Sequence, residues 1–181
     1  METNERKNIF ISLKNDTEIE RGTQVMLEEI LGTYELSKYV RCREVIIEQG
    51  ASGKAFPLIR LSAWKTGRED GLLAQFIHEQ LHWIEEDKEK QMVQAMEELK
   101  NIFPRAPIDK PEGGGSERST YCHLIVCRLE LLALKEILGE KRALDILSGN
   151  TNYTWIRKIV IDHGSEVDRI IEKYFPEALH F

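Results

Sequence analysis

The sequence has no run of about 18 apolar residues, so we expect no membrane-spanning helix. Residues 1–7 are polar and charged and lack the apolar core of a signal peptide. The three cysteines, Cys42, Cys122 and Cys127, form no C-x-x-C pair, and we expect them to be small buried side chains. An odd cysteine count without a targeting signal is typical of a reducing compartment, so the expected location is the cytoplasm.

The sequence also lacks a basic stripe with interleaved aromatic side chains, which usually marks a nucleic-acid-binding face. Its formal net charge of −6 is unfavourable for a polyanionic partner. We therefore expect neither nucleic acid nor a membrane as a partner, and the sequence does not indicate an oligomeric state. A chain of 181 residues is long enough to bury a core, and we expect one domain over residues 1–181.

Hydrophobic patterning predicts an α+β fold that is mostly helical and has a small antiparallel sheet within residues 1–68. Residues 41–48 alternate and are β-branched, and residues 55–64 form a second apolar run; each is typical of a strand. The segment 49–53 between them is expected to be a turn. Pro57 lies near the start of the second strand, which favours an edge position.

Helical spacing of apolar residues continues over most of the remaining chain. Residues 69–138 contain the two helices of the candidate site and a loop between them, and residues 139–181 contain C-terminal helices. Residues 104–118 are rich in proline and glycine and are expected to be that loop, which is a candidate lid over the cleft. The expected helices cover residues 16–31, 69–86, 88–103, 119–138, 140–147, 153–161 and 166–175.

One helix contains the pattern H-E-x-x-H, formed by His78, Glu79, Gln80, Leu81 and His82. One helical turn separates the two histidines, so both imidazoles leave the same face and can share a metal ion. Glu79 is turned about 100° from His78. From there it can take a proton from a metal-bound water. These residues predict a zinc site with a general base beside it.

The two sides of this helix differ in character. The side away from the histidines is apolar, interrupted by Gln80, and is expected to pack on the core. On the histidine side, Gly71 and Ala74 are small enough for another element to approach closely. The apolar residues are Leu73, Phe76, Ile77, Leu81, Trp83 and Ile84.

A catalytic zinc site needs a third protein ligand and an open position for water. The 119–138 helix offers Glu130 and His123, both opposite the polar side marked by Arg128. A buried, unpaired carboxylate at Glu130 costs several kcal/mol, and a metal ion is a natural partner for it. His123 lies about 10 Å away along the helix axis, so both cannot easily bind one ion. It is the alternative third ligand, or a donor to the oxyanion of the transition state.

Other side chains near the site have simpler explanations. Cys127 and Tyr121 are expected to be buried core residues. His163, just before Gly164, is expected to lie at a helix C-terminus, where the dipole favours a cation. The mixed charges of residues 85–90 are expected to face water.

The chain resembles the zincin metallopeptidases, most closely the short gluzincins. This resemblance rests on the H-E-x-x-H segment and on Glu130. It is also similar to small bacterial proteins that share an H-E-Q-L-H-W segment and a later H-L-x-V-x-x-x-E segment, here 78–83 and 123–130. The resemblance implies an active-site helix, a second helix carrying the glutamate ligand, and a small sheet. It also implies that the edge strand, residues 55–64, holds an extended peptide by strand addition.

The chain departs from these families at several positions. Ala133 and Leu134 occupy places where larger gluzincins have an acidic residue, and Leu129 stands where they have asparagine before the glutamate. Glu85 and Lys88 fill places where metzincins have the glycine and histidine of their extended motif. The subfamily and the residues that orient the ligands are therefore not assigned by the resemblance.

The preferred hypothesis is a cytoplasmic zinc-dependent hydrolase that acts on peptides or proteins. It has one Zn²⁺ per chain on His78, His82 and Glu130, with Glu79 as general base and His123 beside the oxyanion. The first alternative is a non-catalytic, metal-stabilised protein-binding module. The second is a helical domain without a metal. Fe²⁺, Mn²⁺ or Co²⁺ would accept the same ligands as Zn²⁺.

Overall fold

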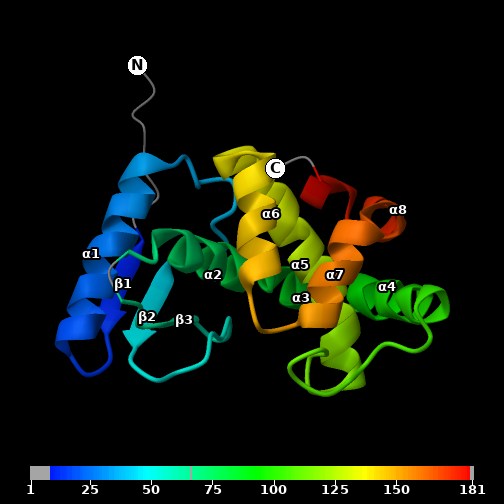
Figure 1. Cartoon of the computed structure of the whole chain (residues 1–181), viewed down its shortest axis with the longest axis horizontal. Coiled ribbons are helices and arrows are strands. Elements are labelled where there is room, and N and C mark those ends of the chain that lie inside the picture. Colours follow the sequence, from blue (N-terminus) through cyan, green and yellow to red (C-terminus); the bar gives the residue numbers. More distant parts are fainter. Residues whose placement is uncertain (1–8, 66, 180–181) are drawn as a thin grey trace. The chain divides into compact units, whose positions relative to one another are not determined.

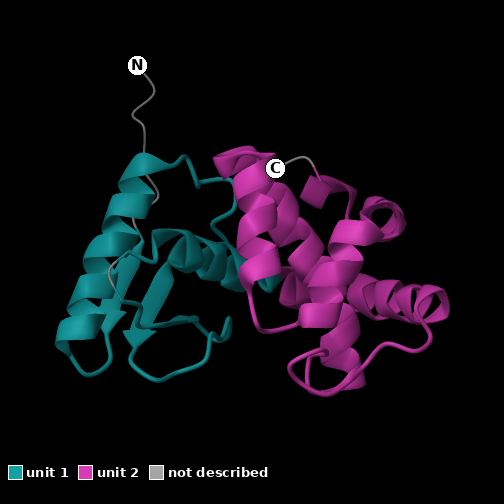
Figure 2. Ribbon diagram, viewed as in Figure 1, with its two compact units in different colours: residues 1–83 teal, residues 84–181 magenta. Residues whose placement is uncertain are grey.

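The computed structural model describes residues 9–65 and 67–179, which leaves the polar segment 1–7 outside the described residues. The described chain is mostly helical, as predicted, and contains a small sheet (Figure 1). It divides into two compact units, residues 1–83 and residues 84–181 (Figure 2).

The sheet of the first unit is parallel. Its strands are β1 (Phe10–Leu13), β2 (Glu44–Glu48) and β3 (Ile59–Ser62), in the order β1-β2-β3, and both neighbouring pairs are parallel. The antiparallel sheet predicted from residues 41–48 and 55–64 is therefore wrong. The strands are shorter than predicted, and β1 is a further strand that the sequence pattern does not predict.

The connections explain the error. Helix α1 (Glu18–Thr33) joins β1 to β2 and returns the chain to the same end of the sheet, as a parallel pair requires. Residues 49–58 make a second return without a helix, because β3 also runs parallel to β2. The turn signal at 49–53 is thus the start of a long connection, in which Lys54 forms an antiparallel bridge with Arg60.

One face of the sheet is covered by helices. Val45, Ile47, Ile59 and Leu61 alternate with less buried residues along β2 and β3. Helix α1 packs against β1 and β2, and helix α2 (Glu69–Leu81) packs against β3 and α1. The core of this unit therefore lies between the sheet and the two helices, and α2 carries the H-E-x-x-H motif.

The edge position predicted for the second strand is confirmed, because β3 is the last strand of the sheet. Its outer side is already paired at Arg60, where the backbone N–H donates to Lys54 O at 2.7 Å and the carbonyl accepts from Lys54 N at 3.0 Å. A peptide that adds to β3 would have to replace this pair, so Arg60 is a poor place for strand addition.

A buried glutamate joins the elements of the first unit. Thr17 and Glu20 form a capping box at the start of α1. The Glu20 carboxylate also accepts hydrogen bonds from the backbone N–H groups of Asn15 and Gln49, at 2.9 Å and 2.8 Å. Burial raises the pKa of Glu20, but the backbone N–H groups outweigh this effect and lower the pKa to about 2.

The second unit is a set of helices around α5 (Glu117–Leu138). Helices α4, α6, α7 and α8 all contact α5, and α4 also contacts α8. The helix predicted at 69–86 is interrupted, because α2 ends at Leu81 and the short helix α3 follows from Trp83 to Asp87. The other bounds are α4 (Glu89–Ile102), α6 (Glu140–Gly149), α7 (Thr154–Asp162), α8 (Gly164–Tyr174) and η1 (Pro176–Leu179).

Arg128 ties α5 to α7 and α8. Its guanidinium forms two hydrogen bonds with the Asp168 carboxylate, at 2.7 Å and 2.5 Å, and a third with Val160 O at 3.0 Å. A Cβ atom on Gly164 would lie 2.4 Å from Arg128 Nη1. The absence of a side chain at Gly164 thus leaves the space that the guanidinium occupies.

Candidate metal centre

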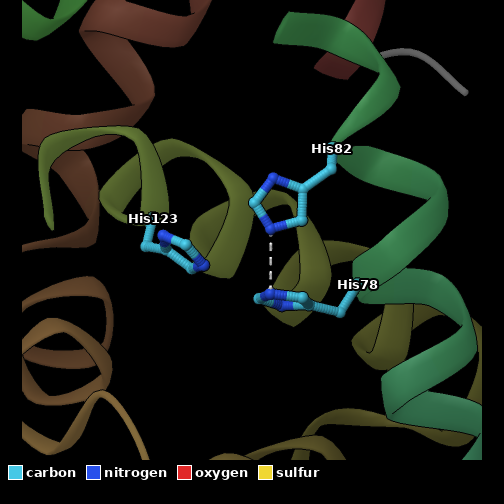
Figure 3. A group of neighbouring side chains, drawn as sticks. All are labelled: His78, His82 and His123. Carbon is cyan, nitrogen blue, oxygen red and sulfur yellow. Dashed lines mark hydrogen bonds between the residues drawn. The ribbon is translucent and has the colours of Figure 1, made fainter. Parts of the chain in front are cut away.

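His78 and His82 place their ring nitrogens side by side on α2. Their Nε2 atoms are 3.2 Å apart, and the rings meet edge to face (Figure 3). Two nitrogens bound to one tetrahedral zinc ion at ~2.0–2.1 Å are about 3.4 Å apart. The histidine pair therefore has the spacing that a shared ion needs, and two neutral imidazoles are donors that zinc prefers.

The helical geometry extends to His82, although α2 ends one residue earlier. The His82 backbone N–H donates to His78 O at 3.2 Å, which keeps the two side chains one turn apart. His78 is buried, with 7% of its surface exposed, whereas His82 is half-buried. One histidine is thus fixed by its surroundings and the other lies nearer to solvent.

Glu79 is buried beside the connection between β2 and β3. Only 6% of its surface is exposed, and a Cβ atom on Gly53 would lie 2.1 Å from its Oε1 atom. The backbone of Gly53 therefore approaches the proposed base as closely as it does because it carries no side chain. The sequence pattern does not single out Gly53, which is 26 positions before Glu79 in the chain.

Polar side chains hold this part of the unit together. Trp64 Nε1 donates to Gln75 Oε1 at 2.7 Å, and Gln75 Nε2 donates to Ser62 Oγ at 3.1 Å. Ser62 in turn donates to Ala51 O at 2.8 Å. These bonds fix α2 against the end of β3 and against the loop that contains Gly53.

The close approach predicted beside Gly71 is confirmed. A Cβ atom on Gly71 would lie 2.7 Å from the Trp64 indole ring, so the ring occupies the space above this glycine. The indole thereby covers the first turn of α2.

Gln80 is a structural residue inside the motif. It is fully buried, and its Oε1 atom accepts from the N–H groups of Arg41 and Cys42 at 2.8 Å and 2.9 Å. Its Nε2 atom donates to Cys42 O at 2.8 Å. The residue that interrupts the apolar side of the helix therefore holds the segment that leads into β2.

His123 lies on α5 in the second unit, and only 7% of its surface is exposed. Figure 3 shows its ring extending from that helix. Its Nδ1 atom is 2.7 Å from Ser119 O, an acceptor, so Nδ1 carries the proton and Nε2 carries the lone pair. Histidine ligands of metals usually have this arrangement, in which one nitrogen donates to the protein and the other binds the ion.

Glu130 forms a buried ion pair with Arg157. The distance from Oε1 to Arg157 Nη1 is 3.2 Å, and the side chains are 1% and 7% exposed. Burial lowers the pKa of Arg157, but the charge and hydrogen bond of Glu130, together with the nearby Cys127 and Tyr153, raise the pKa overall. The burial of Glu130 therefore no longer requires a metal ion as its partner.

The sequence contains a signal for this ion pair. Arg157 stands between the buried residues Ile156 and Val160 on the inward side of α7. A cation on the apolar side of an amphipathic helix needs a buried anion, and Glu130 is the corresponding anion on α5. Each helix thus shows a charge on its buried side, although neither pattern identifies the partner.

The remaining candidates lie as expected. Cys127 is fully buried, and Tyr121 is buried with its hydroxyl donating to Phe103 O at 2.8 Å. Burial also raises the pKa of Tyr121. His163 follows the last residue of α7 as its C-cap and lies 3.5 Å from a Glu166 oxygen.

The described residues include groups of histidine, cysteine and glutamate side chains that could hold a metal ion. His78 and His82 both belong to such groups.

Comparisons with protein families, characterised proteins and solved structures found no match for the chain. Among the described residues, none of the helices combines the length and apolar character needed to cross a membrane. The functional assignment therefore rests on the residues and geometry of the site itself.

Proposed function

We propose that the protein is a zinc-dependent hydrolase that cleaves peptides. The observation that carries this proposal is the 3.2 Å separation of the His78 and His82 Nε2 atoms on α2. Glu79 stands between them in sequence, on the same helix. The two histidine nitrogens supply two metal ligands, and the carboxylate supplies a base.

For the third ligand we propose His123 of α5. Its Nδ1 proton is directed to Ser119 O, which leaves the lone pair on Nε2, the nitrogen suited to bind zinc. Glu130 is the other candidate from the sequence, but its carboxylate is paired with Arg157. Three imidazoles and an open position make a known type of catalytic zinc site.

The chain's own residues would divide the chemistry as follows. When bound, zinc supplies a Lewis acid that makes water more acidic and polarises a carbonyl group. The Glu79 carboxylate accepts the proton of the attacking water and passes it to the leaving amine. Burial of Glu79 keeps this proton transfer away from bulk solvent.

The proposed substrate is a peptide. Amide hydrolysis needs a metal-activated water, a base and a donor for the leaving amine, and zinc and Glu79 supply these functions. The three cysteines are buried and form no disulfide, which fits the proposed cytoplasmic location.

The first test measures metal and turnover on the same preparation. Protein purified without chelator is analysed by elemental mass spectrometry and then incubated with a library of quenched fluorescent peptides. We expect about one zinc per chain and cleavage that a chelator abolishes. The absence of zinc, even after dialysis against zinc, would contradict the proposal.

The matched variant is Glu79→Gln. It should keep the zinc content of the wild type and lose about 100-fold or more in kcat, because the general base is removed and the ligands are not. Full activity in this variant would show that Glu79 is not the base. Zinc binding without cleavage by the wild type would favour the metal-stabilised binding module.

A further inference from the structure

Tyr153 has an unusual backbone conformation beside His123. Its φ and ψ angles are 58° and 37°, the left-handed region that residues other than glycine rarely adopt. Its ring lies against the His123 imidazole, with centroids 4.2 Å apart and planes tilted by 34°. Non-glycine residues in this region persist only where their surroundings hold them, and they cluster at active sites and ligand clamps.

The backbone on both sides of Tyr153 is anchored. Arg157 N–H donates to Tyr153 O at 2.8 Å, and Arg157 Nε donates to Asn152 O at 3.2 Å. On the other side, Thr154 N–H donates to Pro111 O at 3.0 Å. These bonds hold the turn before α7 in a conformation that its own sequence disfavours.

Glu130 in turn holds the guanidinium of Arg157. Both side chains are buried, and the ion pair between them is 3.2 Å long. Arg157 thus donates one hydrogen bond to Glu130 and another to the turn. A continuous set of contacts leads from Glu130 through Arg157 and Tyr153 to His123.

We propose that Tyr153 is a positioning residue for His123, and that the Glu130–Arg157 pair holds Tyr153 in place. This inference rests on the proposed function, in which His123 is the third zinc ligand. Ser119 O fixes one edge of the imidazole and the Tyr153 ring covers one face. Together they limit the rotation of the ring and direct Nε2 to one place, which preorganises the ligand.

The proposal gives Glu130 a task other than metal binding. Its carboxylate orients Arg157, and Arg157 orients the turn that carries Tyr153. A role limited to packing predicts something different: replacing Tyr153 by a residue that accepts the left-handed conformation would change the stability of the fold and leave zinc binding unchanged.

The experiment compares Tyr153→Asn with Tyr153→Phe in the full chain. Asparagine accepts the left-handed conformation but removes the ring, whereas phenylalanine keeps the ring. Zinc affinity is measured by competition with a chromophoric chelator, and the melting temperature is measured on the metal-free protein. Circular dichroism confirms that each variant is folded.

We expect Tyr153→Asn to melt at or above the wild-type temperature and to bind zinc about 10- to 100-fold more weakly, the usual effect of removing a residue that orients a ligand. Tyr153→Phe should bind zinc within about twofold of the wild type, because the ring remains. Wild-type zinc affinity in a folded Tyr153→Asn variant would overturn the inference.

His123→Ala separates this inference from the proposed function. If it leaves zinc affinity unchanged, His123 is not a ligand, and both the ligand assignment and the inference are wrong. If it weakens binding while Tyr153→Asn does not, only the inference is wrong. A wild-type chain that binds no zinc overturns both.

A double-mutant cycle tests the role of Glu130. If Glu130 acts through Tyr153, Glu130→Gln should weaken zinc binding in the wild type but cause no further loss in the Tyr153→Asn background. Losses that simply add would mean that Glu130 contacts the ion or acts independently of Tyr153. That result would overturn this part of the proposal.

Discussion

The side-chain amide of Gln80 forms two hydrogen bonds with the backbone of Cys42. Oε1 accepts from the Cys42 N–H at 2.9 Å, and Nε2 donates to the Cys42 carbonyl at 2.8 Å. Gln80 is fully buried and directly follows Glu79 of the candidate site on α2. The motif helix therefore has a structural contact within the same turn that carries the proposed chemistry.

Gln80→Leu should destabilise the metal-free protein by about 3 kcal/mol, because buried backbone groups lose their hydrogen-bond partners. The free energy of unfolding, measured in urea, provides the test. Gln94→Leu, at an exposed position of α4, is the control and should change stability by less than about 0.5 kcal/mol. Equal effects of the two substitutions would contradict a structural role for Gln80.

Gly53→Ala should impair turnover without removing zinc. The new Cβ atom would lie 2.1 Å from Glu79 Oε1, so the Glu79 side chain has to move. Displacement of the Glu79 carboxylate from its position is expected to lower kcat by about 10- to 100-fold under the proposed function. The neighbouring exposed Ser52 provides the control, and Ser52→Ala should keep the wild-type kcat. A fully active Gly53→Ala variant with normal zinc content would disprove the link.

Glu20 should make the protein sensitive to acid. Its pKa in the folded state is lowered from 4.5 to about 2, so folding favours the ionised carboxylate. Its contribution to stability is complete above pH 4.5 and is lost as the pH falls toward 2. Unfolding free energies measured across this range should fall for the wild type, and Glu20→Gln should reduce the slope.

The control for this experiment is Glu18→Gln, which removes the same charge from an exposed position in the first turn of α1. It should keep the wild-type slope. If both substitutions reduce the slope equally, the acid sensitivity comes from overall charge rather than from the backbone contacts of Glu20.

Zinc should raise the melting temperature of the protein. Binding to the folded state alone stabilises it by about 2.7 kcal/mol when zinc is at 100 times its dissociation constant. His82→Ala should remove most of this effect, because it deletes one nitrogen of the α2 pair. Calorimetry with and without zinc measures the shift, with His163→Ala as a control on an exposed histidine. A zinc-induced shift that survives in His82→Ala would place the ion elsewhere.

The sequence pattern predicts most of the helices but not the topology of the sheet. Apolar residues at helical spacing identify α5, and the observed helix, Glu117–Leu138, begins two residues before the predicted 119–138. Strand direction has no comparable local signal, because it depends on where the chain goes between strands. Residues 49–53 contain turn-forming residues, yet the longer connection they begin leads to a parallel strand.

Local sequence patterns likewise predict only some of the contacts in the candidate site. The spacing of His78 and His82 fixes their relation, since the helical geometry of α2 extends to His82. Gly53 beside Glu79 and Tyr153 beside His123 are contacts between distant parts of the sequence. Local patterning cannot indicate such pairs. The Glu130–Arg157 pair is intermediate, because both helices show a charge on their buried side although neither names its partner.

Gly164 and Arg128 limit the order in which this sequence can change during evolution. A Cβ atom at position 164 would lie 2.4 Å from Arg128 Nη1, so the guanidinium that bonds Asp168 and Val160 would have to move. A lineage that first shortens residue 128 can later accept a larger residue at 164, whereas the reverse order passes through a destabilised intermediate. The two positions, 36 apart in the chain, are therefore expected to diverge as a linked pair.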